Sequence, residues 1–222
     1  MSRNDYDVQR IRTVGSTQLS CEEFVMALAS SAPAPGGGGA AALMGALGSA
    51  LGNMVSALTA GKPKYADVDE EVRQLIVTAN ELQERFIEYV AMDEEVFVPL
   101  AKAYGLPSTT QEERERKAQV MESCLISCSQ VPLDIMRSCA AALEMVERIE
   151  VIGTTIAISD AGCAALALKA ALLSAELNIR ANTMFLKDQT KAEVITAEAE
   201  SIIEKCVPLA DAIHQNVRNR LS

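Results

Sequence analysis

The sequence predicts an all-α protein, a single bundle of several helices packed around one central helix rich in glycine and alanine. Three observations support this fold. Helix-forming residues dominate the composition, almost no segment alternates apolar and polar residues as a strand does, and helix-capping signals recur along the chain. With 222 residues, 49% of them hydrophobic, the chain can bury one sizeable core. We expect an N-terminal extension over residues 1–19 and one helical domain over residues 20–222.

Capping boxes, in which Ser, Thr or Asp precedes Glu by three residues, predict where helices begin. They are Ser20 with Glu23, Asp67 with Glu70, Thr109 with Glu112 or Thr110 with Glu113, and Thr190 with Glu193. The first helix should run to about Ser31, and Gly105 should end a later one after Tyr104. Three prolines fall inside helical patterns, where we expect kinks or short breaks: Pro99, Pro132 and Pro208.

The stretch from residue 24 to residue 61 carries no charged side chain. Small residues recur on one side of it: Gly45, Gly48, Ser49 and Gly52. Such a surface lets another backbone approach closely, so we expect a buried central helix over residues 38–60, apolar on all sides. A membrane-spanning helix is the alternative, since about 20 apolar residues suffice to span. The many small and polar residues and the interruptions by proline and glycine favour the buried helix.

The acidic composition limits the partners. A net charge of −10, four Tyr, four Phe and no Trp argue against nucleic-acid binding. The N-terminal sequence lacks the apolar segment of a signal peptide, so we expect a soluble cytoplasmic protein with reduced cysteines. Cys124 and Cys128 are spaced as metal ligands on a helix, but a closed zinc site needs about four ligands and His214 is remote. We therefore expect packing cysteines and no metal.

A run of four glycines, residues 36–39, follows Pro33 and Pro35 and leads into the predicted central helix. The first turn of a helix exposes unpaired N–H groups that can bind a carboxylate or a phosphate. The alternative is a tight turn that packing alone requires. No GK[ST] sequence follows and no strand precedes the run, so it is neither a P-loop nor a dinucleotide-binding fingerprint.

Asp93 lies on the apolar stripe of the helix predicted after Asp67, between Val90 and Phe97. A carboxylate on a core-facing stripe must be paired, protonated or functional, because burying a bare charge is costly. Burial would raise its pKa towards the range useful for acid–base catalysis. The alternative is a structural ion pair with Lys or Arg.

Three further sets of polar residues are candidates for a site. Ser159 and Asp160 precede an Ala- and Leu-rich helix, where capping alone could account for Asp160. Asn178 and Asn182 share an apolar face of that helix, so their amides need partners. Lys62 flanks a helix end, where a solvated charge is the simpler interpretation.

Taken in order, several segments resemble the cyclodeaminase/cyclohydrolase family. They are residues 31–38, 46–48, 58–65, 93–97, 131–133, 159–162 and 177–188. That family includes the cyclodeaminase half of formiminotransferase-cyclodeaminase and free-standing bacterial methenyltetrahydrofolate cyclohydrolases. The resemblance covers residues 20–215, with departures at Gly39, where the family usually has Ser, and at Cys163 and Ala181, which replace Val and Ile.

The resemblance implies a helical, usually dimeric enzyme with a folate site among its helices and no cofactor besides the tetrahydrofolate substrate. We expect Asp160 and Asp93 to act as carboxylates in charge stabilisation and proton transfer, with Lys62 assisting. The residues expected to position the folate are Pro35, Gly36, Gly37, Gly38, Ser159, Asn178 and Asn182. A Lys or Arg near the mouth of the site should meet the glutamate tail.

Two reactions fit this resemblance. A cyclohydrolase adds water to the methenyl carbon, whereas the alternative, a cyclodeaminase, closes a formimino group and releases ammonia as a lyase. Because the resemblance does not include a transferase half that would deliver a formimino group, we favour the cyclohydrolase. A non-catalytic helical protein that binds folate or a partner is a second alternative, since fold alone does not fix function.

Overall fold

The computed structural model describes residues 15–222, and this part of the chain is helical without any β-strand. The α-helices are α2 (Cys21–Leu28), α3 (Gly37–Thr59), α4 (Asp69–Tyr104), α5 (Gln111–Ile152), α6 (Ile158–Thr183) and α7 (Gln189–Arg220). Three short 3₁₀-helices join them: η1 (Ser16–Gln18), η2 (Pro63–Val68) and η3 (Thr155–Ala157). The all-α prediction is confirmed.

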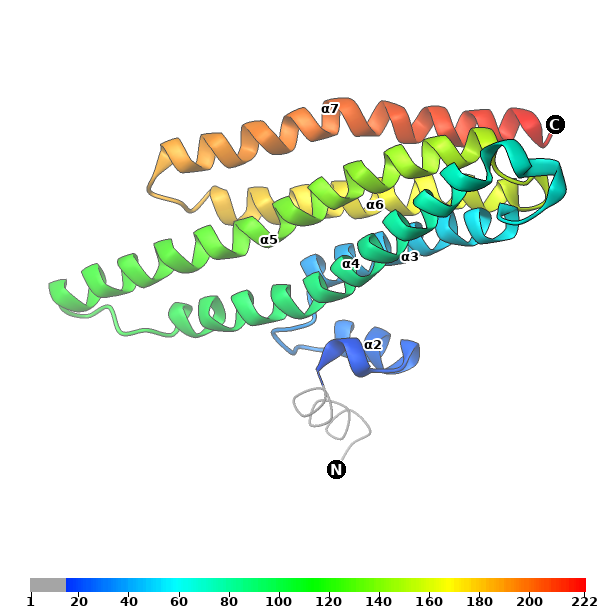
Figure 1. Cartoon of the computed structure of the whole chain (residues 1–222). Coiled ribbons are helices and arrows are strands. Elements are labelled where there is room, and N and C mark those ends of the chain that lie inside the picture. Colours follow the sequence, from blue (N-terminus) through cyan, green and yellow to red (C-terminus); the bar gives the residue numbers. More distant parts are fainter. Residues whose placement is uncertain (1–14) are drawn as a thin grey trace.

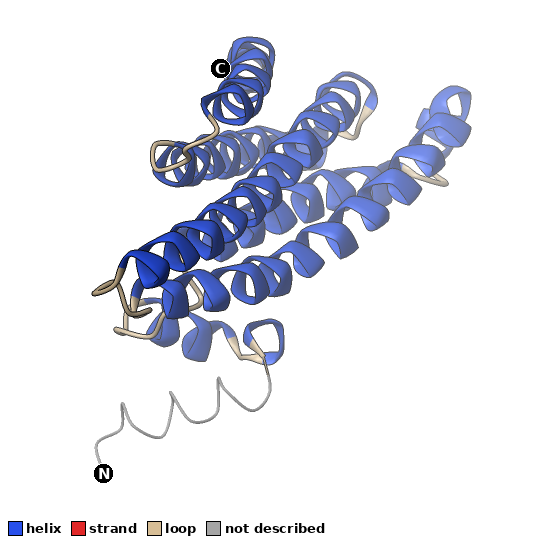
Figure 2. Ribbon diagram, turned by 90° about the vertical axis from the view of Figure 1, so that its left-hand side faces the viewer, coloured by secondary structure: helices blue, strands red, loops and turns tan. Residues whose placement is uncertain are grey.

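The five long helices lie side by side in one elongated bundle, with α4 and α5 crossing in front of α3 and α6 and with α7 along one edge (Figure 1). Figure 2 shows the same bundle turned by 90°, with the short α2 beside the long helices. Helix α3 packs against α4, α5 and α6, while α6 packs against α3, α5 and α7. Among the five long helices, α3 and α6 are the two most apolar, and α5 packs against all four others.

The glycines of α3 allow this close packing, as predicted. A methyl group at Gly45 would collide with the ring of Phe86 on α4, and one at Gly48 would come within 2.7 Å of the Leu168 side chain on α6. The prediction that this helix is buried on all sides is wrong. Its neighbours cover only three sides, and the fourth leaves Leu47 56% exposed.

By length and composition, α3 and the segment Thr155–Thr183 are both apolar enough to cross a membrane. In each of them, half of the most apolar window is buried inside the bundle. These two helices supply much of the core, and the other half of each window is partly buried or exposed.

Two of the predicted capping boxes are confirmed and two are wrong. Ser20 with Glu23 and Thr110 with Glu113 form both reciprocal hydrogen bonds. Asp67 lies within η2, and α4 begins two residues later, where Asp69 accepts the Gly61 N–H. Helix α7 begins after Asp188, whose side chain accepts the N–H of Lys191, so Thr190 does not cap it.

Helix ends follow the sequence signals less closely. The first α-helix ends at Leu28, before the expected Ser31, whereas α4 ends at Tyr104 as predicted. Pro99, Pro132 and Pro208 all lie inside unbroken helices, so the short breaks expected there are not formed.

The structure describes residues 15–19 of the predicted N-terminal extension, and residues 1–14 lie outside the described residues. Within residues 15–19, Ser16 is buried, and its hydroxyl donates a hydrogen bond to the Glu94 carboxylate at 2.7 Å. This end of the extension is thus fastened to α4 next to Asp93.

Candidate active site

A cavity of about 370 Å³ opens where α3 begins and α6 ends. The side chains and backbone that line it come from α4, α5 and α6, from the loop before α3 with the first turn of α3, and from the connection between α6 and α7. They are Pro33, Gly36, Gly37, Gly38, Asp93, Phe97, Leu100, Tyr104, Cys128, Pro132, Asn178, Ala181, Asn182 and Phe185. The volume is within the range of small-molecule sites. The structure thus brings together the glycine run, Asp93 and both asparagines, as predicted.

Asp93 meets the first turn of α3. Its Oδ2 accepts a hydrogen bond from the backbone N–H of Gly39 at 2.8 Å. A methyl group at Gly38 would overlap the Asp93 carboxylate, so only glycine at that position allows the contact. The anion-binding capacity predicted for this helix terminus is therefore used, at least at Gly39, by a carboxylate of the same chain.

Burial raises the pKa of Asp93 above its usual range. The hydrogen bond from Gly39 acts in the opposite direction, and the nearby charge of Glu94 adds to the rise. Among residues 15–222, no Lys or Arg forms an ion pair with Asp93. The structural ion pair considered from the sequence is thus not formed within the described chain, and Asp93 is a partly buried carboxyl group suited to proton transfer.

Asn182, in the wall of the cavity, binds a backbone carbonyl group of α5 that Pro132 leaves unpaired. A proline has no N–H, so the carbonyl group of Cys128, four residues earlier in α5, loses its helical partner. The Nδ2 of Asn182 donates to this carbonyl oxygen at 2.9 Å. The Nδ2 group of Asn182 is therefore already engaged in a hydrogen bond that joins α6 to α5.

Asn178 and Cys128 complete this wall. The Nδ2 of Asn178 donates to the carbonyl of Ser174, and the amide lies against Gly37, 3.2 Å from where a Cβ would stand. The thiol of Cys128 donates to the Val96 carbonyl at 3.2 Å, and burial raises its pKa to about 12. At neutral pH this cysteine is a packing residue rather than a nucleophile.

The remaining predicted site residues do not reach this cavity within one chain. Asp160 and Asn178 are both on α6, but their 18-residue separation corresponds to five helical turns, or about 27 Å. Ser159 lies beside Asp160, and Lys62 follows the far end of α3. Asp160 is also not the N-cap of α6, because the cap is Ala157.

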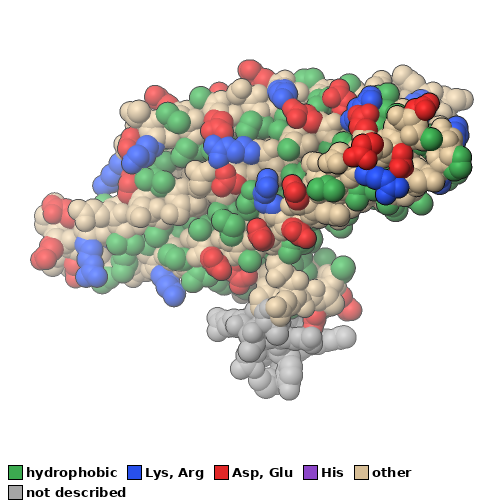
Figure 3. All heavy atoms as spheres, viewed as in Figure 1, with side chains coloured by type: hydrophobic (Ala, Val, Ile, Leu, Met, Phe, Trp, Pro, Cys, Tyr) green, Lys and Arg blue, Asp and Glu red, His purple; other side chains and the backbone are tan. Residues whose placement is uncertain are grey.

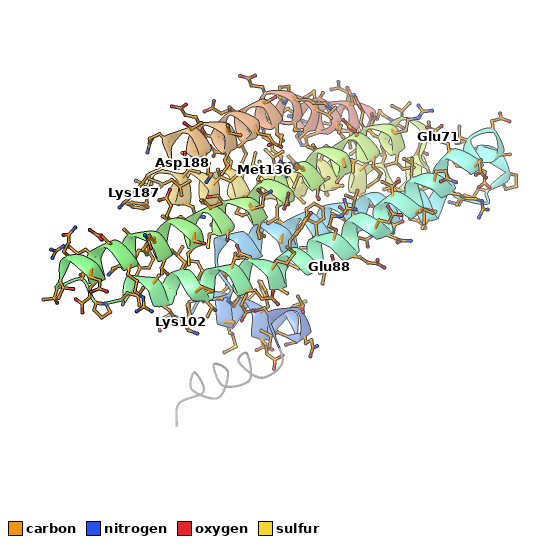
Figure 4. The ribbon with its side chains drawn as sticks, turned by 60° about the vertical axis from the view of Figure 1, so that its left-hand side comes forward. Glu71, Glu88, Lys102, Met136, Lys187 and Asp188 are labelled. Carbon is orange, nitrogen blue, oxygen red and sulfur yellow. The ribbon has the colours of Figure 1, made fainter. Side chains whose placement is uncertain are left out.

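Figure 4 marks the two ends of the bundle. Lys187 and Asp188 are labelled at the α6–α7 connection, on the side of the cavity, and Glu71 at the opposite end, near the start of α4. Lys62 and Asp160 belong to the end marked by Glu71. Within one chain, the length of α6 therefore separates Lys62, Ser159 and Asp160 from the Asp93 cavity.

Pro35 also differs from the prediction. It is buried beneath the glycine run, 3.6 Å from where a Cβ of Gly39 would stand, and does not line the cavity. Within the described residues, the cavity lining contains neither Lys nor Arg, so the cation expected near its mouth is not among these residues.

Comparison with known proteins identifies the family. The family model described as formiminotransferase-cyclodeaminase matches residues 20–201. The chain belongs to this family. A methenyltetrahydrofolate cyclohydrolase of Methylorubrum extorquens is 38% identical to it, over 90% of this chain and 97% of that protein.

Other members of the formiminotransferase-cyclodeaminase family match less closely in sequence. The formimidoyltransferase-cyclodeaminase of Mus musculus is 31% identical over 77% of this chain, which corresponds to 31% of its own length. The crystal structure of a formiminotetrahydrofolate cyclodeaminase from Thermotoga maritima superposes with a TM-score of 0.78 and 25% identity, covering 92% of this chain and 96% of the other. The likeness to that structure extends over the whole bundle.

The cavity around Asp93 has an aromatic rim that was not predicted from the sequence. Phe97, Tyr104 and Phe185 all line the cavity, out of only four Phe and four Tyr in the chain. Tyr104 is 55% exposed and Phe185 is 59% exposed. Flat aromatic side chains that are open to solvent beside such a cavity can pack against the face of a ring-containing ligand.

A broader, shallow depression of about 770 Å³ lies between α5 and the α6–α7 connection of this family member. Its carboxylate Glu122 accepts the backbone N–H groups of Lys187 and Asp188, both at 2.9 Å. These bonds lower the pKa of Glu122 and fasten the connection to α5. We assign the depression a structural role, because its central carboxylate is already hydrogen-bonded to backbone.

Proposed function

We propose that this chain is a methenyltetrahydrofolate cyclohydrolase, which converts 5,10-methenyltetrahydrofolate and water into 10-formyltetrahydrofolate. The observation that carries the proposal is the match to the cyclohydrolase of Methylorubrum extorquens over nearly the full length of both chains. The cavity around Asp93 supports it, because it offers one carboxyl group with a raised pKa and an aromatic rim.

The chemistry requires both protons to leave a water molecule, while one proton reaches a nitrogen and one is released to solvent. Water attacks the cationic carbon that bridges N5 and N10, and a base removes a proton from the attacking water. The carbon–N5 bond then breaks while N5 is protonated and the hydroxyl group on the carbon loses its proton, which leaves the formyl group on N10. A carboxylate beside the cationic carbon stabilises it and can accept the proton from water, and we assign this role to Asp93.

The second candidate function is the cyclodeaminase. In that reaction N10 attacks the formimino carbon, and ammonia leaves after it has been protonated. A specific observation favours this candidate: the Thermotoga maritima protein, whose name is formiminotetrahydrofolate cyclodeaminase, is matched over 96% of its chain. From the sequence alone, a resemblance without a transferase half argued against the cyclodeaminase. The match to the Thermotoga maritima protein weakens that argument.

We further infer that the protein acts as a soluble cytoplasmic homodimer on a free folate. The acidic chain has little to attract nucleic acid. The aromatic rim provides a surface for the ring system of the folate. In this proposal no cofactor is needed besides the tetrahydrofolate substrate.

Two assays on the purified protein separate the candidates. The first follows the loss of methenyltetrahydrofolate absorbance against a control without enzyme, and the second measures ammonia released from formimino-tetrahydrofolate. Acceleration of the first reaction supports the cyclohydrolase, whereas ammonia release without acceleration of methenyl hydrolysis would favour the cyclodeaminase. Activity in neither assay, with folate bound, would indicate the non-catalytic binding protein.

A further inference from the structure

The segment before α2 is fastened to the helix that carries Asp93. Ser16, in η1, is 3% exposed, and its hydroxyl donates to Oε2 of Glu94 at 2.7 Å. Glu94 follows Asp93 directly in α4 and is half-buried, whereas the next residue, Glu95, is exposed. One neighbour of Asp93 is therefore a carboxylate that a distant part of the chain holds in place.

The backbone on both sides of Ser16 sets its position. The chain turns at Gly15, whose φ of 75° lies in the left-handed region that favours glycine. Leu19 packs against the core, and the capping box of Ser20 with Glu23 starts α2 directly afterwards. The segment is thus held by more than the single hydroxyl bond, and a variant without the hydroxyl should keep the same backbone.

Glu94 is the charged group that acts on Asp93. Neither η1 nor α3, which meets Asp93 at Gly39, carries a charged residue. The described cavity lining from α5 and α6 has no charged side chain; its titratable group there is Cys128, and Tyr104 is the one from α4. Burial raises the pKa of Cys128 to about 12, so this thiol is neutral near pH 7. After burial, the charge of Glu94 is the other influence that raises the pKa of Asp93.

Acidic side chains are common on this side of the bundle, but Glu94 is held more firmly than an exposed one. Figure 3 shows Asp and Glu side chains on the bundle surface beside the N-terminal segment. An exposed carboxylate changes its rotamer in water and is screened by salt, so it affects a neighbour little. Glu94 is half-buried, and its Oε2 is bound to a buried hydroxyl, so its charge stays close to Asp93.

We propose that Ser16 is a positioning residue of the active site, which holds the Glu94 carboxylate beside Asp93 and so fixes the charge that faces the proton acceptor. The proposal rests on the proposed function, since it concerns the proton acceptor of that same reaction. Ser16 lies outside residues 20–201, the part of the chain that matches the family model. The contact therefore joins the matched domain to a segment that precedes it.

This arrangement makes the proton affinity of Asp93 depend on the N-terminal segment. Without the Ser16 hydroxyl, Glu94 can turn into solvent, where water and salt screen its charge. Asp93 then loses one of the two influences that raise its pKa, and it ionises at lower pH. Because Asp93 acts as a base in its ionised form, the acidic limb of kcat/KM against pH moves to lower pH with it.

Carbon-13 NMR of the aspartate side-chain carboxyl groups tests the contact without any activity measurement. The spectrum of Asp93→Asn identifies the Asp93 signal in the labelled protein. The titration midpoint of that signal should be lower in Ser16→Ala and in Glu94→Gln than in the wild type. Glu95→Gln is the matched control, because it removes the same charge from an exposed neighbour and should move the midpoint far less.

The double variant Ser16→Ala/Glu94→Gln shows whether Ser16 acts through Glu94. Its midpoint should equal that of Glu94→Gln alone, since the hydroxyl then has no carboxylate to hold. Ser56→Ala controls for the loss of a buried hydroxyl, because Ser56 is 0% exposed and bonds within α3, and the Asp93 midpoint should not move. An unchanged midpoint in Ser16→Ala, or shifts that add up in the double variant, would overturn the proposal.

The pH profile with methenyltetrahydrofolate connects the contact to the reaction. Relative to the wild type, kcat/KM of Ser16→Ala should be roughly two- to threefold higher on the acidic limb than on the plateau, as expected for one solvent-screened charge nearby. A lowered Asp93 midpoint with an unchanged profile would overturn the assignment of Asp93 as the proton acceptor. An unchanged midpoint overturns the role of Ser16 alone, so the two claims fail separately.

Discussion

The carboxylate of Asp93 accepts the backbone N–H of Gly39 at 2.8 Å, which joins the middle of α4 to the first turn of α3. Two opposing influences meet at this contact. Burial in the cavity raises the pKa of Asp93, and the helix N–H lowers it, with burial the larger of the two. The glycine run therefore holds a carboxyl group close to a helix terminus while the fold keeps it partly desolvated, which is the environment that proton transfer requires.

The fit of Asp93 against the glycine run predicts that Gly38→Ala lowers activity. The added methyl group would overlap the carboxylate, so Asp93 or the helix terminus must shift. We expect a loss of kcat of roughly 100-fold, since small displacements of a catalytic group have effects of that order. Gly36→Ala is the matched comparison, because its methyl group meets nothing within 4 Å, and it should lower kcat far less. Equal losses in the two variants would contradict the steric argument.

The raised pKa of Asp93 predicts a pH-dependent difference in stability. Because folded Asp93 keeps its proton at pH values where the unfolded chain has lost it, the folded state binds more protons in that window, and stability falls as pH rises through it. Asp93→Asn cannot ionise and avoids this loss. Urea unfolding should show the variant gaining stability over the wild type between about pH 4 and about pH 7. A difference that is the same at both pH values would argue against the raised pKa.

The same variant should lose turnover while it gains stability at neutral pH. Asn keeps the shape of Asp and can still accept the Gly39 N–H, so the fold is expected to survive. Loss of the proton acceptor should lower kcat by at least roughly 100-fold, the lower part of the range for acid–base groups. Near-normal kcat in a folded Asp93→Asn variant would remove Asp93 from the reaction.

The sequence predicted those features that depend on local patterns. Composition and capping signals are local, and they predicted the helical class and two of the helix starts. Asp93 was identified because a carboxylate interrupts an apolar stripe, which can be read along one helix. The central helix was predicted from its small residues, although the number of sides that its neighbours cover depends on the packing of the whole bundle.

The remaining features depend on relations between distant segments. Tyr104 ends α4 and Phe185 follows α6, and only the packing of both helices beside α5 places them at one cavity. Asp160 and Asn178 were predicted to share a site because both lie in family-like segments, yet a straight helix holds them about 27 Å apart. A sequence order that resembles a family does not show how far apart in the fold the matching segments lie.

The bond between Asn182 and the Cys128 carbonyl predicts a conditional effect on stability. Asn182→Ala leaves a buried carbonyl without a partner, which should cost about 1–3 kcal/mol of unfolding free energy. If Pro132 is first replaced by Ala, the new N–H can pair with the carbonyl within α5. In that background Asn182→Ala should cost clearly less, and urea unfolding of the four proteins measures the coupling. Additive costs would mean that Asn182 stabilises the fold in some other way.

The aromatic rim predicts that substrate binding weakens when either exposed ring is removed. Tyr104 and Phe185 line the cavity but make no hydrogen bond to Asp93, so their replacement should raise KM with little change in kcat. Aromatic contacts of this kind contribute about 0.5–1.5 kcal/mol, so Tyr104→Leu and Phe185→Leu should each raise KM roughly 2- to 10-fold.

Met184→Ala is the matched control, because Met184 is also exposed and adjoins Phe185 in sequence but does not line the cavity. Steady-state kinetics with methenyltetrahydrofolate measures all three. If the two Leu variants lowered kcat at unchanged KM, the rings would act on the reacting groups rather than on binding. If Met184→Ala raised KM as much as they do, the change would belong to the α6–α7 connection instead of the rim.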